Sequence, residues 1–388
     1  MPYIANTEDQ RREMLEAIGF SSMSELWEAA GIKTPPPELK LPEGMSEYEV
    51  RRYLTSIAEQ NAHDLVCFLG LGFYDHFIPA VVDDVIRRTE FLTAYTPYQP
   101  EASQGTLQTI YEFQSMICRL TGMEAANASL YEGGTALFEA MMMAVRSVRN
   151  RRKAVVAGSI SPIYREMLRC YCRNLNVELV ITPAPPAGDT HTDLDSLAEA
   201  VDDSTSAVIL PYPNTFGTVE DFREIIDLAH ARGALCIAST YPMALSLIEA
   251  PAELGFDIVC GEAQCFGLPL SFGGPYLGYI ACRKKYLRQL PGRIVGRTTE
   301  QDGEKEAFVL TLQAREQHIR RERATSNICS NEGLCAIAAT VYLSVIGKHG
   351  FRRLGELCHS KAVYLRELLA QIDGVSCPRQ EGFFNEFV

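Results

Sequence analysis

The fold is decided by residues 206–239, which read SAVILPYPNTFGTVEDFREIIDLAHARGALCIAS. Two short apolar runs, SAVILPYP and ALCIAS, lie on either side of FREIIDLAHARG, whose apolar residues recur at helical spacing. A strand, a helix and a second strand of these lengths form a βαβ unit, in which the two strands run parallel. We therefore expect a sheet with parallel strands in this part of the chain.

The same alternation extends toward the N-terminus. AVVAG at residues 154–158 and VELVI at residues 177–181 are further short apolar runs, and helix-like segments separate them. Repeated βα units bury both faces of a sheet under helices. The sequence therefore predicts an α/β fold with a mostly parallel sheet covered by helices.

We expect three parts along the chain. Residues 1–65 form an N-terminal helical arm, because Thr7 precedes an amphipathic stretch and Ser46 with Glu49 makes a capping box. Residues 66–330 form the large α/β domain. Residues 331–388 contain two helical segments and then the apolar run GFFNEFV, which we expect to end in a strand.

Composition excludes several classes of protein. The formal net charge of −13 and the pI near 5.1 argue against nucleic acid as a partner. The N-terminus is charged and no run of about 18 apolar residues occurs, so we expect neither secretion nor a membrane span. The twelve cysteines have no zinc-ribbon spacing. We expect reduced, mostly buried thiols, a cytoplasmic protein and no metal.

Two glycine-containing segments have some features of loops that bind phosphate groups. LYEGGT at residues 130–135 turns tightly just before a helix, whose free N–H groups could hold a phosphate, although such turns often serve backbone geometry alone. FLGLGFYDH at residues 68–76 lacks the third glycine of a dinucleotide-binding loop. NAD binding is therefore not expected, and we expect these glycines to allow a close backbone approach at a subunit contact.

A polar loop is the first candidate for substrate contacts. YTPYQPEASQG at residues 95–105 combines hydroxyl and amide side chains with two stiffening prolines. The alternative interpretation is a packed connection whose tyrosines fill the core.

An arginine-rich segment is the second candidate. REQHIRRERATSNIC at residues 315–329 contains four arginines in an acidic protein. Guanidinium groups bind carboxylates and phosphates through paired hydrogen bonds. The alternative is a solvated helix face with ion pairs, and His318 alone is more often structural than catalytic.

Six segments together resemble the glycine cleavage system P-protein, in its two-subunit bacterial form of glycine decarboxylase. They are YTPYQPEASQG, YEGGTA, PYPNTFG, FGLPLSFGGPYLG, PGRIVG and REQHIRRERATSNIC, and the likeness spans nearly the whole chain. The resemblance implies fold type I of the pyridoxal-phosphate enzymes. It also implies two homologous halves, of which only one carries the lysine that binds the cofactor.

This chain resembles the half without the lysine. No lysine occurs between Lys153 and Lys284, and the expected position falls on Gln264 or Cys265 within the segment 255–282. Without an amine there, no Schiff base can form. The aspartate that fold type I enzymes place beside the pyridine nitrogen is replaced by Ser239 or Ala238.

The resemblance implies a division of labour between subunits. A lysine-bearing subunit 2 binds pyridoxal phosphate covalently, the complex decarboxylates glycine, and the aminomethyl group passes to the lipoyl group of the H-protein. This chain would then bind no cofactor covalently and would complete the partner's active site in a heterotetramer.

We expect two groups of side chains to reach that site. The catalytic group is Tyr95, Thr96, Tyr98, Gln99, Glu101 and His318. The group expected to contact the cofactor phosphate or the substrate carboxylate across the interface is Arg315, Arg320, Thr325 and Asn327.

The sequence leaves two alternatives open. One is a self-sufficient pyridoxal-phosphate enzyme that uses Lys284 or Lys285, and another is a degenerate scaffold or regulatory subunit that contributes no catalytic group. The family's chains continue beyond a segment like FFNEFV into a small C-terminal lobe, so the C-terminal part is expected to be truncated.

Overall fold

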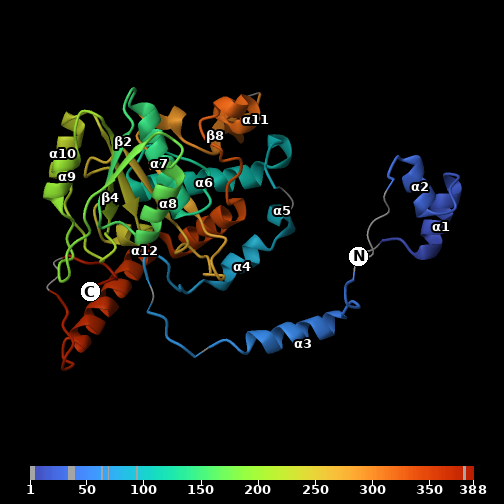
Figure 1. The fold of residues 1–388 in the computed structure, drawn as a ribbon, viewed down its shortest axis with the longest axis horizontal. Coiled ribbons are helices and arrows are strands. Elements are labelled where there is room, and N and C mark those ends of the chain that lie inside the picture. Colours follow the sequence, from blue (N-terminus) through green and yellow to red (C-terminus); the bar gives the residue numbers. More distant parts are fainter. Residues whose placement is uncertain are drawn as a thin grey trace. The chain divides into compact units, whose positions relative to one another are not determined.

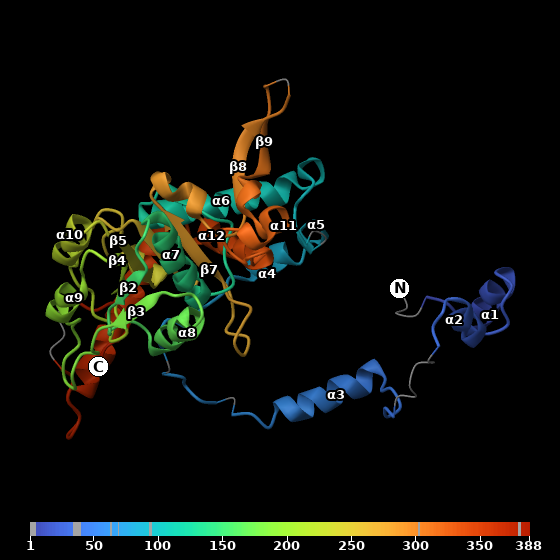
Figure 2. The same cartoon turned by 45° about the horizontal axis from the view of Figure 1, so that its top comes forward.

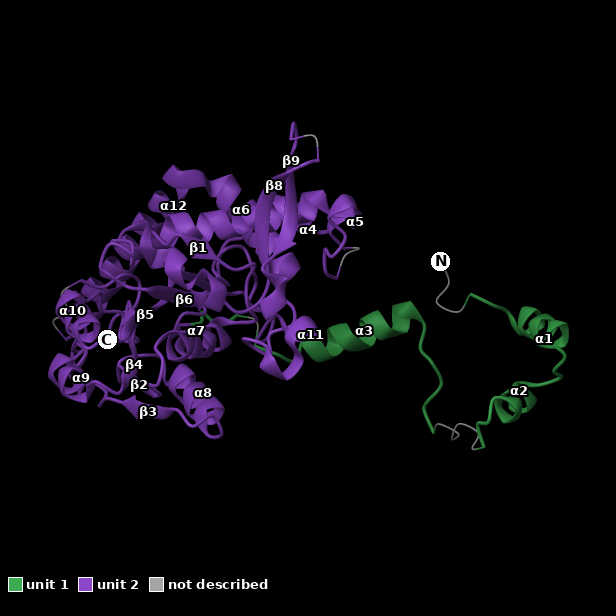
Figure 3. Ribbon diagram, turned by 90° about the horizontal axis from the view of Figure 1, so that it is seen from above, with its two compact units in different colours: residues 1–67 green, residues 68–388 purple. Residues whose placement is uncertain are grey.

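The computed structural model describes residues 5–33, 40–62, 64–68, 70–92, 95–301, 303–378 and 382–388. The chain forms two compact units, residues 1–67 and 68–388, which Figure 3 shows in different colours. The sequence predicts domain boundaries at residues 65 and 330, and these boundaries stay a prediction. In the structure, α12 packs inside the second unit.

Helices and strands alternate through the second unit (Figure 1). The helices are α1 (Glu8–Ala17), α2 (Met23–Ala29) and α3 (Glu47–Ala58) in the first unit, then α4 (Ala80–Ile86), α5 (Thr89–Leu92), α6 (Gln104–Thr121), α7 (Gly133–Ser147), α8 (Pro162–Cys172), α9 (Leu194–Ala200), α10 (Arg223–Ala231), α11 (Gln317–Arg320) and α12 (Gly333–Leu369). Short 3-10 helices are η1 (Pro100–Ala102), η2 (Pro242–Ser246), η3 (Lys284–Gln289), η4 (Gln313–Arg315) and η5 (Arg321–Arg323).

The strands form one large sheet and one hairpin. They are β1 (Ala125–Ala126), β2 (Lys153–Val156), β3 (Glu178–Ile181), β4 (Thr205–Tyr212), β5 (Leu235–Thr240), β6 (Ile258–Glu262), β7 (Gly278–Cys282), β8 (Ile294–Thr299) and β9 (Glu306–Thr311). The seven-stranded sheet has the order β1-β7-β6-β5-β4-β2-β3, and β8 with β9 forms the hairpin that projects in Figure 2.

The mostly parallel sheet predicted from the sequence is confirmed. The strands β3, β2, β4, β5 and β6 run parallel, while β7 is antiparallel to both of its neighbours. All eight residues of β4 are buried, which explains the continuous apolar run in a strand with both faces covered. The carboxyl ends of these parallel strands meet at one edge of the sheet.

Alternate side chains of each strand enter two separate cores. On one face Ile209 and Ile237 pack with α7 and α8, and on the other face Val208 and Ala238 pack with α6, α9, α10 and α12. This follows from the period of two along a strand. Both faces of the sheet are therefore covered by helices.

The N-terminal helices begin where the sequence predicts. Thr7 and Gln10 cap α1 reciprocally, and Ser46 and Glu49 do the same for α3. No described residue of α3 is buried within the chain. The arm is helical, as expected.

The helix α12 is the longest of the helices among the described residues. Its length and composition would suit a membrane span, but it is broken at Gly347, where φ is 59°. Its first half packs against α6 with Ala336, Ala339 and Tyr342 in the core. These properties are those of a core helix.

The expectation that the chain ends in a strand is wrong. The described residues 382–388 make only an isolated bridge between Thr218 and Phe383. Side chains hold this tail instead, because Phe384 is buried and the Glu386 carboxylate accepts the Leu71 N–H at 2.7 Å. A Cβ on Gly70 would lie 2.4 Å from that carboxylate, so the close approach at this glycine is to the chain's own tail.

Candidate functional site

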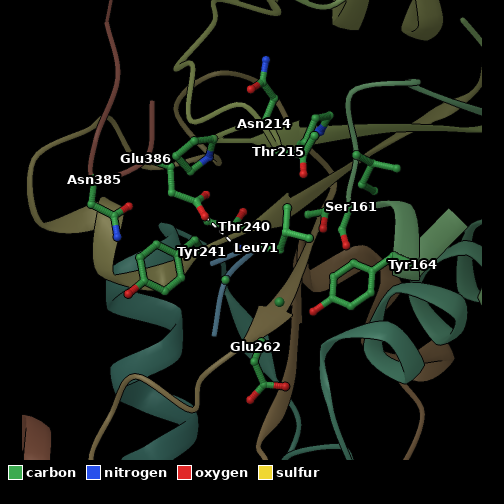
Figure 4. A pocket seen from close by; sticks show the side chains of 16 residues that line it. Leu71, Ser161, Tyr164, Asn214, Thr215, Thr240, Tyr241, Glu262, Asn385 and Glu386 are labelled. Atoms are coloured by element: carbon green, nitrogen blue, oxygen red, sulfur yellow. Dashed lines mark hydrogen bonds between the residues drawn. The ribbon is translucent and has the colours of Figure 1, made fainter. Parts of the chain in front are cut away.

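A small cavity lies at the carboxyl ends of β4, β5 and β6 (Figure 4). Ligand sites in open α/β sheets form at this edge. Ser239, Tyr164 and Glu262 contribute to its lining, and Asn385 and Glu386 come from the C-terminal tail. The cavity measures about 70 Å³. Sites for small molecules and cofactors usually enclose about 300–1,000 Å³, so this space does not accommodate pyridoxal phosphate.

The carboxylate of Glu262 occupies the N-terminus of α7. One of its oxygens accepts the Gly133 N–H at 2.8 Å, and the other accepts the N–H groups of Gln264 and Leu277, each at 2.9 Å. Burial raises the pKa of Glu262 to about 7. An anion at a helix N-terminus is favoured by the free N–H groups and by the helix dipole. Glu262 therefore takes the place that the sequence offered to a phosphate.

Other side chains also fill the space at the N-terminus of α7. The N-cap residue Glu132 accepts the Thr135 N–H at 2.8 Å. A Cβ on Gly133 would lie 2.4 Å from the Tyr164 hydroxyl, and one on Gly134 would lie 2.3 Å from the Met167 sulfur. The glycines of the YEGGT turn thus make room for the chain's own side chains. The phosphate site expected at residues 130–135 is filled from within.

The two positions expected for the cofactor lysine lie in the core. Gln264 and Cys265 are fully buried. The Gln264 amide donates to the Leu268 carbonyl at 2.6 Å and to the Tyr74 carbonyl at 3.1 Å. Ser239 lines the cavity at the end of β5 without a carboxylate. The cavity is too small for pyridoxal phosphate, neither Gln264 nor Cys265 supplies a lysine amine, and Glu262 fills the phosphate position. The residues of this pocket therefore do not fit the cofactor.

The predicted loop 95–101 lies outside this cavity. Tyr95 is 88% exposed and Tyr98 is 51% exposed. The Tyr98 N–H donates to the Thr96 carbonyl at 2.9 Å, and η1 leads from this loop into α6. Gln99 and Glu101 are also exposed. The alternative in which both tyrosines fill the core is therefore wrong.

The arginine-rich segment forms the short elements η4, α11 and η5 and not one long helix. Arg315 donates to the carbonyls of Leu290 and Gly292, the second at 2.6 Å. Arg320 donates through Nε to the Ala314 carbonyl at 2.9 Å. Burial lowers the pKa of Arg315. The interpretation as one solvated helix face is wrong for this segment, because Arg315 is pinned to the backbone.

The structure brings the two predicted motifs together. The rings of Tyr98 and His318 meet edge to face with centroids 6.0 Å apart. His318 Nδ1 lies 3.7 Å from a carboxylate oxygen of Glu316, a buried residue whose pKa is raised by desolvation. Among the remaining predicted residues of the two motifs, those with exposed side chains are Tyr95, Gln99, Glu101, Arg320 and Asn327.

Tyr98 and His318 form an exposed cluster with the buried Glu316, and a cationic cavity opens beside this cluster. It measures about 330 Å³, and its lining includes Arg288, Arg315, Arg320, Arg323 and Thr325. The Thr325 N–H donates to the Arg315 carbonyl at 3.1 Å, which fixes the return of the segment. Several guanidinium groups around one space favour an anionic ligand such as a phosphate or a carboxylate.

One residue of the cluster was missed in the sequence. Arg293 is only 2% exposed, and its guanidinium donates to the Tyr98 hydroxyl at 2.9 Å and to the Ser330 hydroxyl at 3.1 Å. The signal was present in PGRIVG, where an arginine directly precedes an apolar strand start. A buried arginine is rare unless it is paired.

The chain is similar to known proteins along its whole length. The family model described as "Glycine cleavage system P-protein" matches residues 1–388. A probable glycine dehydrogenase (decarboxylating) subunit 1 from Oleidesulfovibrio alaskensis is 50% identical over 387 residues, which cover 100% of this chain and 86% of that protein. The protein of the same description from Geotalea uraniireducens is 51% identical with the same coverage.

Solved structures show the same fold. A crystal structure of glycine decarboxylase (P-protein) of the glycine cleavage system, in inhibitor-bound form, superposes with a TM-score of 0.91 at 40% identity and covers 100% of this chain and 86% of that one. Sphingosine-1-phosphate lyase from Burkholderia pseudomallei superposes with a TM-score of 0.64 at 14% identity, covering 92% of this chain and 81% of that one. The second likeness concerns the fold alone.

Proposed function

This chain belongs to the glycine cleavage system P-protein family, and from that premise we propose that it completes the active site of a lysine-bearing partner subunit in glycine decarboxylase. The fold is that of the fold type I pyridoxal-phosphate enzymes. The chain acts as subunit 1 of a glycine dehydrogenase (decarboxylating), as part of a complex.

A single observation carries this proposal. The chain's own cavity is closed by Glu262 and Tyr164, whereas Tyr98 and His318 meet at an exposed cluster beside a cavity lined by arginines. If the chain bound a cofactor of its own, we would expect an open internal cavity with these polar groups facing into it. Groups collected at an accessible surface are suited to a ligand that another subunit holds.

The family is pyridoxal-phosphate dependent, and the division of binding between subunits is part of the proposal. The partner, subunit 2, binds the cofactor covalently through its lysine, and this chain binds none covalently. Glycine is the substrate and the lipoylated H-protein receives the aminomethyl group. The acidic charge and the twelve free thiols support a cytoplasmic setting without nucleic acid.

The two groups of side chains have different tasks in this proposal. Tyr95, Thr96, Tyr98, Gln99, Glu101 and His318 supply hydroxyl, amide, carboxylate and imidazole groups to the partner's site. Arg315, Arg320, Thr325 and Asn327 contact the cofactor phosphate or the glycine carboxylate across the interface. The common cavity of Arg315, Arg320 and Thr325 supports the second task. Contact between Tyr98 and His318 supports the first.

Tyr98→Phe tests whether this chain contributes to the chemistry. In complex with subunit 2, we expect this variant to lower glycine-dependent exchange of labelled bicarbonate by about 10- to 100-fold, because a positioned hydrogen-bond donor is lost. Assembly, followed by size-exclusion chromatography, should be unchanged. Tyr364→Phe is the matched control, since Tyr364 is an exposed residue of α12. Equal activity of both variants would support a scaffold and would remove Tyr98 from the site.

A further inference from the structure

Arg293 forms the base of the exposed cluster. It directly precedes β8, and its carbonyl oxygen accepts the Ala128 N–H at 2.8 Å. The preceding carbonyl, that of Gly292, accepts a hydrogen bond from Arg315 at 2.6 Å. The backbone at this position is thus held from two sides. The Arg293 side chain extends from this rigid backbone to the exposed Tyr98.

We infer that Arg293 is a positioning residue that fixes the Tyr98 hydroxyl as a hydrogen-bond donor toward the partner's active site. This inference rests on the proposed function, because it assigns a task to a residue of the proposed site. It adds a residue that neither predicted motif contains.

The polarity of the contact between the two side chains supports this role. A guanidinium group has only donors, so in the 2.9 Å contact the Tyr98 oxygen must accept. The phenolic hydrogen of Tyr98 then points away from Arg293. Because Tyr98 is half exposed, that hydrogen is available to an acceptor on a bound ligand. Arg293 therefore selects one of the two hydrogen-bonding roles of the tyrosine.

The ring of Tyr98 is held as well as its hydroxyl. The central guanidinium carbon lies 5.2 Å from the ring centroid, and the His318 ring lies edge to face at 6.0 Å. A cation over an aromatic ring is attracted by the quadrupole of the ring, and this attraction adds to the hydrogen bond. Together the contacts restrict the plane of the phenol and the direction of its oxygen.

The cost of burying Arg293 indicates a role beyond packing. Desolvating a guanidinium is unfavourable unless its donors are satisfied. Its two terminal nitrogens donate to Tyr98 and Ser330, whereas its Nε has no partner among the described residues. Glu316, which is buried close by, is the carboxylate that interacts with it electrostatically. A side chain kept only to fill space would not place its charged end on an exposed tyrosine.

The test is a double-mutant cycle on the assembled complex. We expect Arg293→Ala to lower glycine-dependent bicarbonate exchange about as much as Tyr98→Phe does, by about 10- to 100-fold, and Arg293→Lys to lower it less, since one ammonium keeps the charge but cannot hold Tyr98 and Ser330 in the same fork. In the Tyr98→Phe background neither change should lower the rate further, because residues that act as a unit are not additive. Arg293→Lys keeps the charge and most of the volume, and it carries the test if Arg293→Ala fails to fold.

Chemical rescue gives a second readout that a purely structural role would not produce. Millimolar guanidinium should raise the exchange rate of the Arg293→Ala complex by at least about 10-fold. It should not raise the rate of the double variant that also carries Tyr98→Phe. Urea at the same concentration and ionic strength is the control. Rate losses that multiply across the cycle, or rescue that is independent of Tyr98, would overturn this inference alone. A fully active Tyr98→Phe complex would overturn the proposed role of Tyr98 itself.

Discussion

Glu262→Ala should destabilise the isolated chain by about 3 kcal/mol or more, because it leaves three buried N–H groups without an acceptor. These are the N–H groups of Gly133, Gln264 and Leu277, which all donate to this carboxylate. Folded domains are stable by only about 5–15 kcal/mol, so the loss is a large fraction of the total. Chemical denaturation followed by circular dichroism measures it.

A matched control makes this prediction specific. Glu178→Ala changes an exposed glutamate at the start of β3 and should leave the stability within about 0.5 kcal/mol. A Glu262→Ala chain as stable as the Glu178→Ala control would show that these three N–H groups do not depend on Glu262 as their acceptor.

The pKa of Glu262 gives the sign of a pH effect. Burial raises this pKa from an ordinary value of 4.5 to about 7, so the folded chain binds the proton more tightly than the unfolded chain does. The stabilisation is fully present below pH 4.5 and is lost as the pH rises through 7. Glu262→Gln removes this titration. Relative to that variant, the native chain should lose up to about 3 kcal/mol across this window. A difference that does not change with pH would show that Glu262 does not titrate there.

Arg315→Ala should lower the exchange activity of the assembled complex by about 100-fold or more. Arg315 holds two carbonyl groups, those of Leu290 and Gly292, and lines the cationic cavity. Its loss removes a positive charge and releases the backbone that carries Arg293. The affinity of the complex for pyridoxal phosphate, titrated by visible absorbance, should fall as well.

Arg315→Lys separates charge from geometry. A lysine keeps the positive charge but cannot donate to two carbonyls in one plane, so we expect it to restore little activity. Arg353→Ala is the matched control, because Arg353 is an exposed arginine of α12. Unchanged activity and cofactor affinity in Arg315→Ala would remove this residue from the proposed site.

The sheet could be predicted from the sequence because its signals are local. The runs at residues 154–158, 177–181, 206–213 and 234–239 are short, apolar and separated by helical patterns, and each became a strand. The end of the chain was mispredicted for a related reason. The apolar run GFFNEFV has the composition of a strand, but only Phe383 makes a bridge, and the tail is held by Phe384 and Glu386.

The site could be predicted only in part. Tyr98 and His318 stood out as members of unusual motifs, but their contact depends on how α6 and the β8–β9 hairpin pack, which no local signal gives. Glu262 was overlooked although a carboxylate at the end of the apolar strand IVCGE is a visible anomaly. Its meaning depends on Gly133, which lies 129 residues earlier in the chain.

In the proposed complex, this chain completes a site whose cofactor the partner holds. The most direct measurement is visible absorbance at about 420 nm, taken with pyridoxal phosphate for this chain alone and after mixing with subunit 2, together with glycine-dependent bicarbonate exchange. We expect no bound-cofactor absorbance from this chain alone, and exchange activity only in the mixture. Borohydride-trapped cofactor on a lysine of this chain, or full exchange by subunit 2 alone, would contradict it.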